Sequence, residues 1–124
     1  MKIKRLIIPL IIIGTLLIAF ALIFTVMAHK SLSFSSGRYF LADNGSDMLI
    51  LENSPFVMSN RTKNENMFSK LDTGDKILVL HDGLAESYPG KTGAYFVLKL
   101  GRGSIADIKS SVLESLSKLG YLQD

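Results

Sequence analysis

The sequence predicts an α+β protein in which one N-terminal transmembrane helix carries a single small β-rich domain that ends in an amphipathic helix. Three observations support this prediction. Residues 6 to 28 contain no charged side chain. Residues 37 to 100 alternate between short runs of strand-forming residues and turn signals. After Gly103 the apolar residues recur every three or four positions, which is the period of a helix.

The uncharged run Leu6–Ala28 is long enough to cross a membrane. As a helix its twenty-three residues extend about 34 Å, against a hydrocarbon core about 30 Å thick. Basic side chains precede the run, so the positive-inside rule places residues 1–5 in the cytoplasm, residues 6–28 across the membrane as a signal anchor, and the domain outside. The basic residues are Lys2, Lys4 and Arg5.

A cleaved signal peptide has the same basic start, so a second localisation stays open. Val26, Met27 and Ala28 would suit a cut ahead of His29, which would release a secreted protein. The apolar run is longer than the core of a usual signal peptide, and this favours an anchor that is retained. Residues 29–36, with four serines, are interpreted as a spacer, and residues 37–124 as the extracytoplasmic domain.

The net charge of +3 belongs to the anchor. Four basic residues flank the apolar run, and the remainder of the chain has ten basic and eleven acidic residues. Nucleic acid is therefore not expected as a partner, because phosphate binding needs clustered cations. The absence of cysteine excludes disulfides, thiolate metal sites and a lipid-anchored cysteine on this chain.

The first two strands are predicted at 37–42 and 47–52. Between them lies Asn44-Gly45, the strongest short signal for a β-hairpin. A third, short run at 56–58 follows Pro55 and is predicted as an edge strand, because proline removes a ladder hydrogen bond. Residues 60–69 are polar and are expected to form a surface loop that Met67 and Phe68 hold down.

Two more strands and a helix complete the domain. Strands are predicted at 76–80 and 94–100, with the turn-rich residues 81–93 between them. The helix is predicted to start near Ser104 or Asp107 and to end near Gly120. Its apolar stripe, expected to pack on the sheet, contains Ile105, Ile108, Val112, Leu113, Leu116 and Leu119.

Residues 74–89 carry a family resemblance. The sequence Gly-Asp-Lys at 74–76 leads through a strand to His81-Asp82-Gly83 and then to Ala-Glu-Ser-Tyr-Pro at 85–89. This pattern resembles the YobA-like family of small bacterial extracytoplasmic proteins. The resemblance implies an OB-like antiparallel β-barrel of about five strands, anchored in a membrane, with no established activity. The C-terminal helix and the missing lipid-anchor cysteine depart from the family pattern.

The densest cluster of ionisable side chains lies in the same segment and is the candidate binding site: His81, Asp82, Glu86 and Tyr88. Two turns, at Asp82-Gly83 and at Pro89-Gly90, would preorganise it, so we expect Glu86 and Tyr88 to be anchored and His81 to lie at the rim of the barrel. The alternative is that these residues only make the turns. No catalytic residue, metal site or cofactor is predicted.

Two other patterns favour structure over chemistry. Gly101-Arg102-Gly103-Ser104 precedes a helix, but its spacing fits neither a P-loop nor a dinucleotide-binding loop, so a tight connection is predicted. The aromatic pairs at 39–40 and 95–96 could stack on bases or sugars, but without clustered cations they are predicted to be core.

The expected function is a binding or interaction module at the bacterial envelope that recognises a protein, peptide or small ligand. The alternative is a structural or assembly partner that acts through its transmembrane helix, where Gly14, Ala19 and Ala21 offer small residues for helix packing. An envelope enzyme is a third class. The membrane is the one partner that the composition itself indicates.

Overall fold

The structure is a computed structural model that describes residues 2–29 and 31–123. The chain forms two compact units, one that ends at Leu32 and one that begins at Ser33. The side chains of residues 2–4 and 27–29 lie outside the described residues, as does residue 30. The predicted charge bias rests on Lys2, Lys4 and Arg5, and two of these side chains lie outside the described residues, so it stays a prediction.

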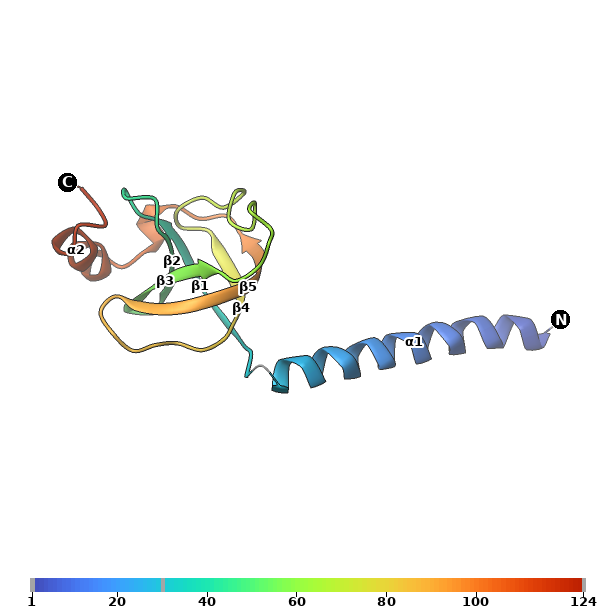
Figure 1. The fold of residues 1–124 in the computed structure, drawn as a ribbon. Helices are drawn as coiled ribbons and strands as arrows, with labels where there is room; N and C mark the ends of the chain where they lie inside the picture. The colour runs from blue at the N-terminus through green and yellow to red at the C-terminus, as the bar shows by residue number, and fades with distance from the viewer. Residues whose placement is uncertain (1, 30, 124) are drawn as a thin grey trace. The chain divides into compact units, whose positions relative to one another are not determined.

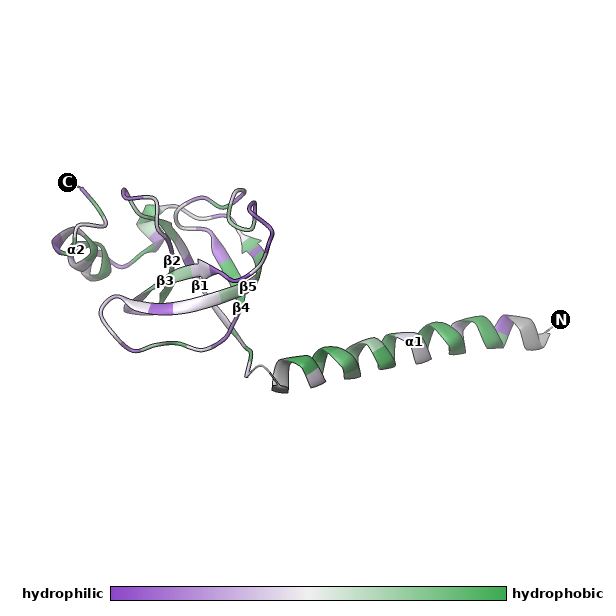
Figure 2. Ribbon diagram, in the orientation of Figure 1, coloured by the Kyte–Doolittle hydropathy of each residue, from purple (hydrophilic) through white to green (hydrophobic). Residues whose placement is uncertain are grey.

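Helix α1, Lys2–His29, is long and apolar enough between Arg5 and Val26 to cross a membrane. Between its two grey ends the helix is mostly hydrophobic (Figure 2). The hydroxyl groups of Thr15 and Thr25 donate to the backbone carbonyls of Ile11 and Ala21, so these two polar groups are satisfied within the helix. A signal sequence near the N-terminus has the same properties.

The second unit is a closed five-stranded β-barrel followed by a short helix (Figure 1). Its strands are β1 (Ser33–Leu41), β2 (Asp47–Leu51), β3 (Ser54–Asn60), β4 (Lys76–His81) and β5 (Gly90–Gly101). Around the barrel the order is β1-β2-β3-β5-β4, and β4 pairs with β1 to close it. The fold class is therefore α+β, as predicted.

The barrel corrects two predictions about strand pairing. It is not wholly antiparallel, because β3 and β5 run parallel from the pair Phe56 and Gly90 to the pair Asn60 and Ala94. Nor is β3 an edge strand. Pro55 lies opposite Ile50 of β2, and the other side of β3 pairs with β5. A closed barrel has no edges, so the proline occupies the start of a paired strand.

The predicted hairpin is confirmed. Strands β1 and β2 pair in register from Arg38 and Ile50 to Leu41 and Asp47. In the turn, Gly45 has a φ of +88°, and the Asn44 side chain accepts a hydrogen bond from the Ser46 amide at 3.0 Å. However, β1 begins at Ser33, so the last four residues of the expected spacer 29–36 belong to the barrel, where they pair with β4.

Hydrophobic side chains form two cores because the strands alternate between an inner and an outer face. The inner core lies inside the barrel and includes Tyr39, Leu49, Ile77 and Val79. Met67 and Phe68 from the loop after β3 pack against it, as expected. The Tyr39 hydroxyl donates to Asp47, and burial is the main cause that raises the pKa of Tyr39 far above its ordinary value.

The outer core joins the barrel to the C-terminal helix. Phe40, Met48 and Ile50 project from the outer face of β1 and β2 and pack with Val112 and Leu116 of helix α2, Ser110–Lys118. Adjacent residues of one strand thus supply different cores, as Tyr39 and Phe40 show. The pattern explains why β2 is apolar on both faces.

The C-terminal segment corrects the prediction of one continuous helix. A short 3-10 helix at Ile105–Asp107 comes first, and Ile108 is then extended, with φ −97° and ψ 133°. This break turns the Ile108 side chain into the outer core, where it is 4% exposed. Ile105 and Leu119, expected on the packed stripe, are exposed.

Helix α2 ends as the sequence predicts. Gly120 has a φ of +86°, its amide donates to the Ser117 carbonyl, and the Tyr121 amide donates to the Leu116 carbonyl. These two bonds make the Schellman motif that glycine permits at a helix end.

Candidate functional site

The predicted site lies in the connection between β4 and β5, residues 82–89. The two strands are antiparallel neighbours, and a bridge between Ala85 and Lys91 continues their pairing into the connection. Gly83 has a φ of +127°, as the predicted Asp-Gly turn requires. Strand β5 begins at Gly90, four residues earlier than expected, because these residues also pair with β3.

His81 is a buried framework residue at the end of β4. It is 3% exposed. Its Nδ1 accepts a hydrogen bond from the Gly83 amide at 3.1 Å, so the proton of the neutral ring is on Nε2, which lies 2.7 Å from the Ser35 Oγ and donates to it. Burial lowers the pKa of His81, while the nearby Asp82 carboxylate opposes the shift. The ring is therefore neutral at pH 7 and fixes the start of the turn.

Asp82 fastens the connection to the neighbouring strand. Its Oδ1 accepts the Gly93 amide at 2.9 Å, and its Oδ2 lies 3.6 Å from the Arg61 Nε. A β-carbon at Gly93 would lie 2.4 Å from the Asp82 Oδ2 and 2.5 Å from that Nε. Glycine at 93 therefore allows the carboxylate to lie against the β5 backbone.

Glu86 and Tyr88 correct the expectation that both would be anchored. Both are exposed, Tyr88 by 53%. Within the described residues, neither side chain makes a hydrogen bond or an ion pair that holds it. The reason is the bridge at Ala85 and Lys91, beyond which residues 86–89 leave the sheet. There the Ser87 hydroxyl donates to the Pro89 carbonyl at 2.8 Å.

The structure thus divides the four predicted residues into two pairs. His81 and Asp82 hold the base of the connection, together with the Thr92 hydroxyl, which donates to the Gly83 carbonyl at 2.6 Å. Glu86 and Tyr88 are displayed at its tip. Beside the base lies an open cavity of about 480 Å³, where Arg61 and Lys91 supply positive charge and Asp82 negative charge. The fixed base limits the backbone ordering that binding would require, and the exposed side chains at the tip are accessible to a partner.

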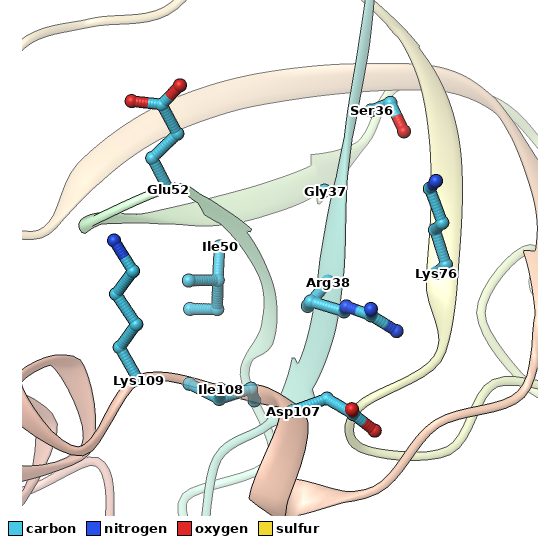
Figure 3. A pocket seen from close by; sticks show the side chains of 9 residues that line it. All are labelled: Ser36, Gly37, Arg38, Ile50, Glu52, Lys76, Asp107, Ile108 and Lys109. Atoms are coloured by element: carbon cyan, nitrogen blue, oxygen red, sulfur yellow. The ribbon is translucent and has the colours of Figure 1, made fainter.

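A second cavity, of about 220 Å³, was not predicted (Figure 3). Ile50 and Ile108 are among its lining residues, and the charged side chains around them are Arg38, Glu52, Lys76, Asp107 and Lys109. Figure 3 shows Glu52 and Lys109 on one side and Arg38 and Lys76 on the other. These residues come from distant segments, so no local spacing in the sequence could have indicated them.

The sequence motif Gly74-Asp75-Lys76 has a structural explanation. Asp75 is 1% exposed. Its carboxylate accepts the amides of Asp72 at 2.8 Å and Gly103 at 3.2 Å and pairs with the Lys99 Nζ at 2.9 Å. The Asp72 bond is the main cause that lowers the pKa of Asp75, and burial opposes it. Because Gly103 binds this carboxylate, the segment 101–104 serves as a connection.

The positions of the aromatic residues and of the possible metal ligands bear on the other predictions made from the sequence. Tyr39 and Phe40 are core residues, as predicted, whereas the same prediction is wrong for Phe96, which is 50% exposed. Among the described residues, no three histidine or carboxylate side chains converge to hold a metal ion. The sequence matches no family model, no curated protein and no solved structure.

Proposed function

We propose that this chain is a single-pass membrane protein whose OB-like barrel lies outside the cytoplasm and recognises a protein, peptide or small ligand through the β4–β5 connection. The observation that carries the binding proposal is the division within that connection. Its base is fixed because the His81 and Asp82 side chains accept backbone amides and the Thr92 hydroxyl donates to a carbonyl, while Glu86 and Tyr88 are exposed at its tip.

The composition of α1 supports the membrane anchor. Along Arg5–Val26 none of the helix is buried, and its large apolar side chains are exposed, for example Leu16 by 54% and Phe24 by 67%. Such a surface is unfavourable in water and suits a hydrocarbon environment. The basic residues before it favour a cytoplasmic N-terminus.

The barrel topology supports the OB-like assignment and directs attention to the loop. OB-folds are five-stranded barrels that bind ligands on the face of strands 2 and 3 and with the loops 1–2 and 4–5. Here α2 covers Met48 and Ile50 on the outer face of β2. The β4–β5 connection corresponds to one of the two loops of such a binding surface, and it displays the exposed side chains of Glu86 and Tyr88. Its resemblance to the YobA-like segment is consistent with the same proposal.

The experiment compares partner capture by three forms of the full-length protein in membranes, with a photo-crosslinker placed at Ser87. We expect Glu86→Ala combined with Tyr88→Ala to lose the crosslinked partner. The matched control, Glu114→Ala combined with Leu119→Ala, removes one exposed carboxylate from α2 and one exposed apolar side chain just after it, and this variant should keep the partner.

Two outcomes would contradict the proposal. Equal capture by all three forms would exclude the loop as the site. Capture that depends only on the sequence of α1, tested by exchange for an unrelated spanning helix, would favour the alternative function through helix packing. Thermal melts of all forms must agree, because an unfolded variant would lose any partner.

A further inference from the structure

A second surface of the barrel is apolar and uncovered. In register, Phe34, Leu80 and Phe96 lie opposite one another across β1, β4 and β5. Ser36, Leu78 and Leu98 form the next row. Residues that face each other across antiparallel strands lie on the same side of a sheet, and these point outward, since the alternate residues Val79 and Ile77 are in the inner core.

The exposure of these side chains is high for strand residues. Phe34 and Phe96 are each 50% exposed, and Leu98 and Leu100 are 46% and 48% exposed. The outer face of β1 is covered at its other end, where Phe40 packs under α2. The outer face of β1 is thus covered by α2 at one end and exposed to solvent at the other. Contiguous exposed apolar side chains of this kind mark contact surfaces. Leu78 and Leu80, between the exposed side chains, are half-buried. We call the set Phe34, Leu78, Leu80, Phe96, Leu98 and Leu100 the outer apolar face.

The charged side chains on the three strands that carry the outer apolar face are of one sign, although Glu52 and Asp107 lie near Arg38 and Lys76 in the second cavity. Strands β1, β4 and β5 contain no aspartate or glutamate, and their basic residues are Arg38, Lys76, Lys91 and Lys99. Lys99 is paired with Asp75. An apolar strand surface whose own charges are all basic complements a membrane of anionic lipids, whose acyl chains accept the apolar groups and whose headgroups attract the cations.

The position of this face in the chain favours the same occupant. Phe34 follows His29, the last residue of α1, by five positions, so chain connectivity limits the separation of their α-carbons to about 18 Å. The headgroup zone of a bilayer adds about 5–8 Å outside the hydrocarbon on each side. If α1 spans a membrane, the short linker therefore keeps Phe34 close to the lipid headgroups.

We propose that the outer apolar face contacts the surface of the anionic membrane in which α1 is anchored. This inference rests on the proposed anchor and is independent of the β4–β5 binding site. It implies that one side of the barrel is reserved for lipid.

The absence of cysteine from the sequence makes a direct test possible. Single cysteines at Ser36→Cys and Leu98→Cys place an environment-sensitive fluorophore on the outer apolar face of the full-length protein. Ser111→Cys places it on an exposed position of α2, and Ile13→Cys places it in α1. Each protein is reconstituted in phosphatidylcholine vesicles with and without phosphatidylglycerol, and the lipids carry a nitroxide quencher near the headgroup or deep in the acyl chain.

We expect the shallow quencher to remove fluorescence at positions 36 and 98 but not at 111, and the effect to be larger with phosphatidylglycerol and smaller at high salt. The label at position 13 should respond to the deep quencher. Ser36→Cys changes a single side-chain atom, so it reports even if Leu98→Cys perturbs the barrel.

The outcomes separate the two proposals. Quenching at position 13 without quenching at 36 and 98 would overturn lipid contact and leave the anchor in place. No quenching at position 13 would overturn both. Labels at 36 and 98 that are protected from aqueous iodide but insensitive to the nitroxide lipids would show a protein on this face, either a second copy or another partner, and would also overturn lipid contact. Equal quenching at 111 would show unspecific adsorption, with the same consequence.

Discussion

The titratable residues of the barrel mostly serve its framework. His81 is buried with both ring nitrogens in hydrogen bonds, and Asp75 is buried with two backbone amides and a lysine. Composition alone could not separate these roles from ligand binding, because the same residue types serve both. The burial of a side chain and its hydrogen-bond partners determine which role it has. Both depend on strands that are distant in the sequence.

The His81 ring predicts a pH dependence of stability. Its pKa is lowered in the folded state from an ordinary value of 6.5, so the unfolded chain binds a proton more readily. The stabilisation is therefore complete above about pH 6.5 and is lost as the pH falls through the lower, folded-state pKa. We expect the free energy of unfolding of the full-length protein in detergent to fall between pH 7.5 and pH 5.

The control is His81→Gln, which removes the titrating ring. It should be less stable at pH 7.5 by about 1–3 kcal/mol, because a buried bond is disturbed, but should lose less stability between the two pH values. An equal loss in both proteins would show that carboxylates or His29 cause the effect.

The backbone conformation of Glu52 indicates that a substitution at this position can stabilise the protein. Glu52 lies in the two-residue turn between β2 and β3 and has a φ of +51°. This conformation is unfavourable for residues other than glycine, asparagine and aspartate. Glu52→Asn should raise the free energy of unfolding by about 1 kcal/mol, measured by urea titration. Glu114→Asn, in α2, should not raise it. A destabilised Glu52→Asn would show that the glutamate has a compensating partner.

At the scale of elements, local signals predicted local features. Asn44-Gly45 and Gly120 formed the expected turn and helix end because both act through the conformation of one or two residues. The ends of strands were less predictable. Ser33–Ser36 is polar apart from Phe34, and Gly90–Gly93 is turn-forming in sequence, but both are strands because β4 and β3 offer them hydrogen-bond partners. The break at Ile108 likewise follows from packing.

The packing of helix α2 implies that one substitution, at Leu116, strongly lowers the stability of the domain. Leu116 is fully buried in the outer core. Leu116→Ala should lower the free energy of unfolding by about 2–5 kcal/mol, as truncations of buried leucine do. Ser111→Ala, on an exposed position of the same helix, should change it little. Similar melting temperatures for the two variants would show that α2 does not hold its place on the barrel.

At the scale of the whole molecule, the fold class was predictable from the sequence, but the strand pairing that closes the barrel was not. Five strand signals and a terminal helix follow from periodicity, but the parallel β3–β5 pair joins residues more than thirty positions apart and has no local signature. The candidate site behaved in the same way. Its location in a turn-rich segment was evident from sequence, whereas the division between a fixed base and an exposed tip needed the register of β4 and β5.

The central claim is that α1 anchors a barrel that lies outside the cytoplasm, and a fusion after Asp124 tests it most directly. A reporter that is active only outside the cytoplasm should be active at this position, because Lys2, Lys4 and Arg5 favour a cytoplasmic N-terminus. It should fractionate with membranes, with residues 1–28 still present by mass spectrometry. Activity of a cytoplasmic reporter alone would contradict the orientation, and a soluble product that begins at His29 would contradict the anchor.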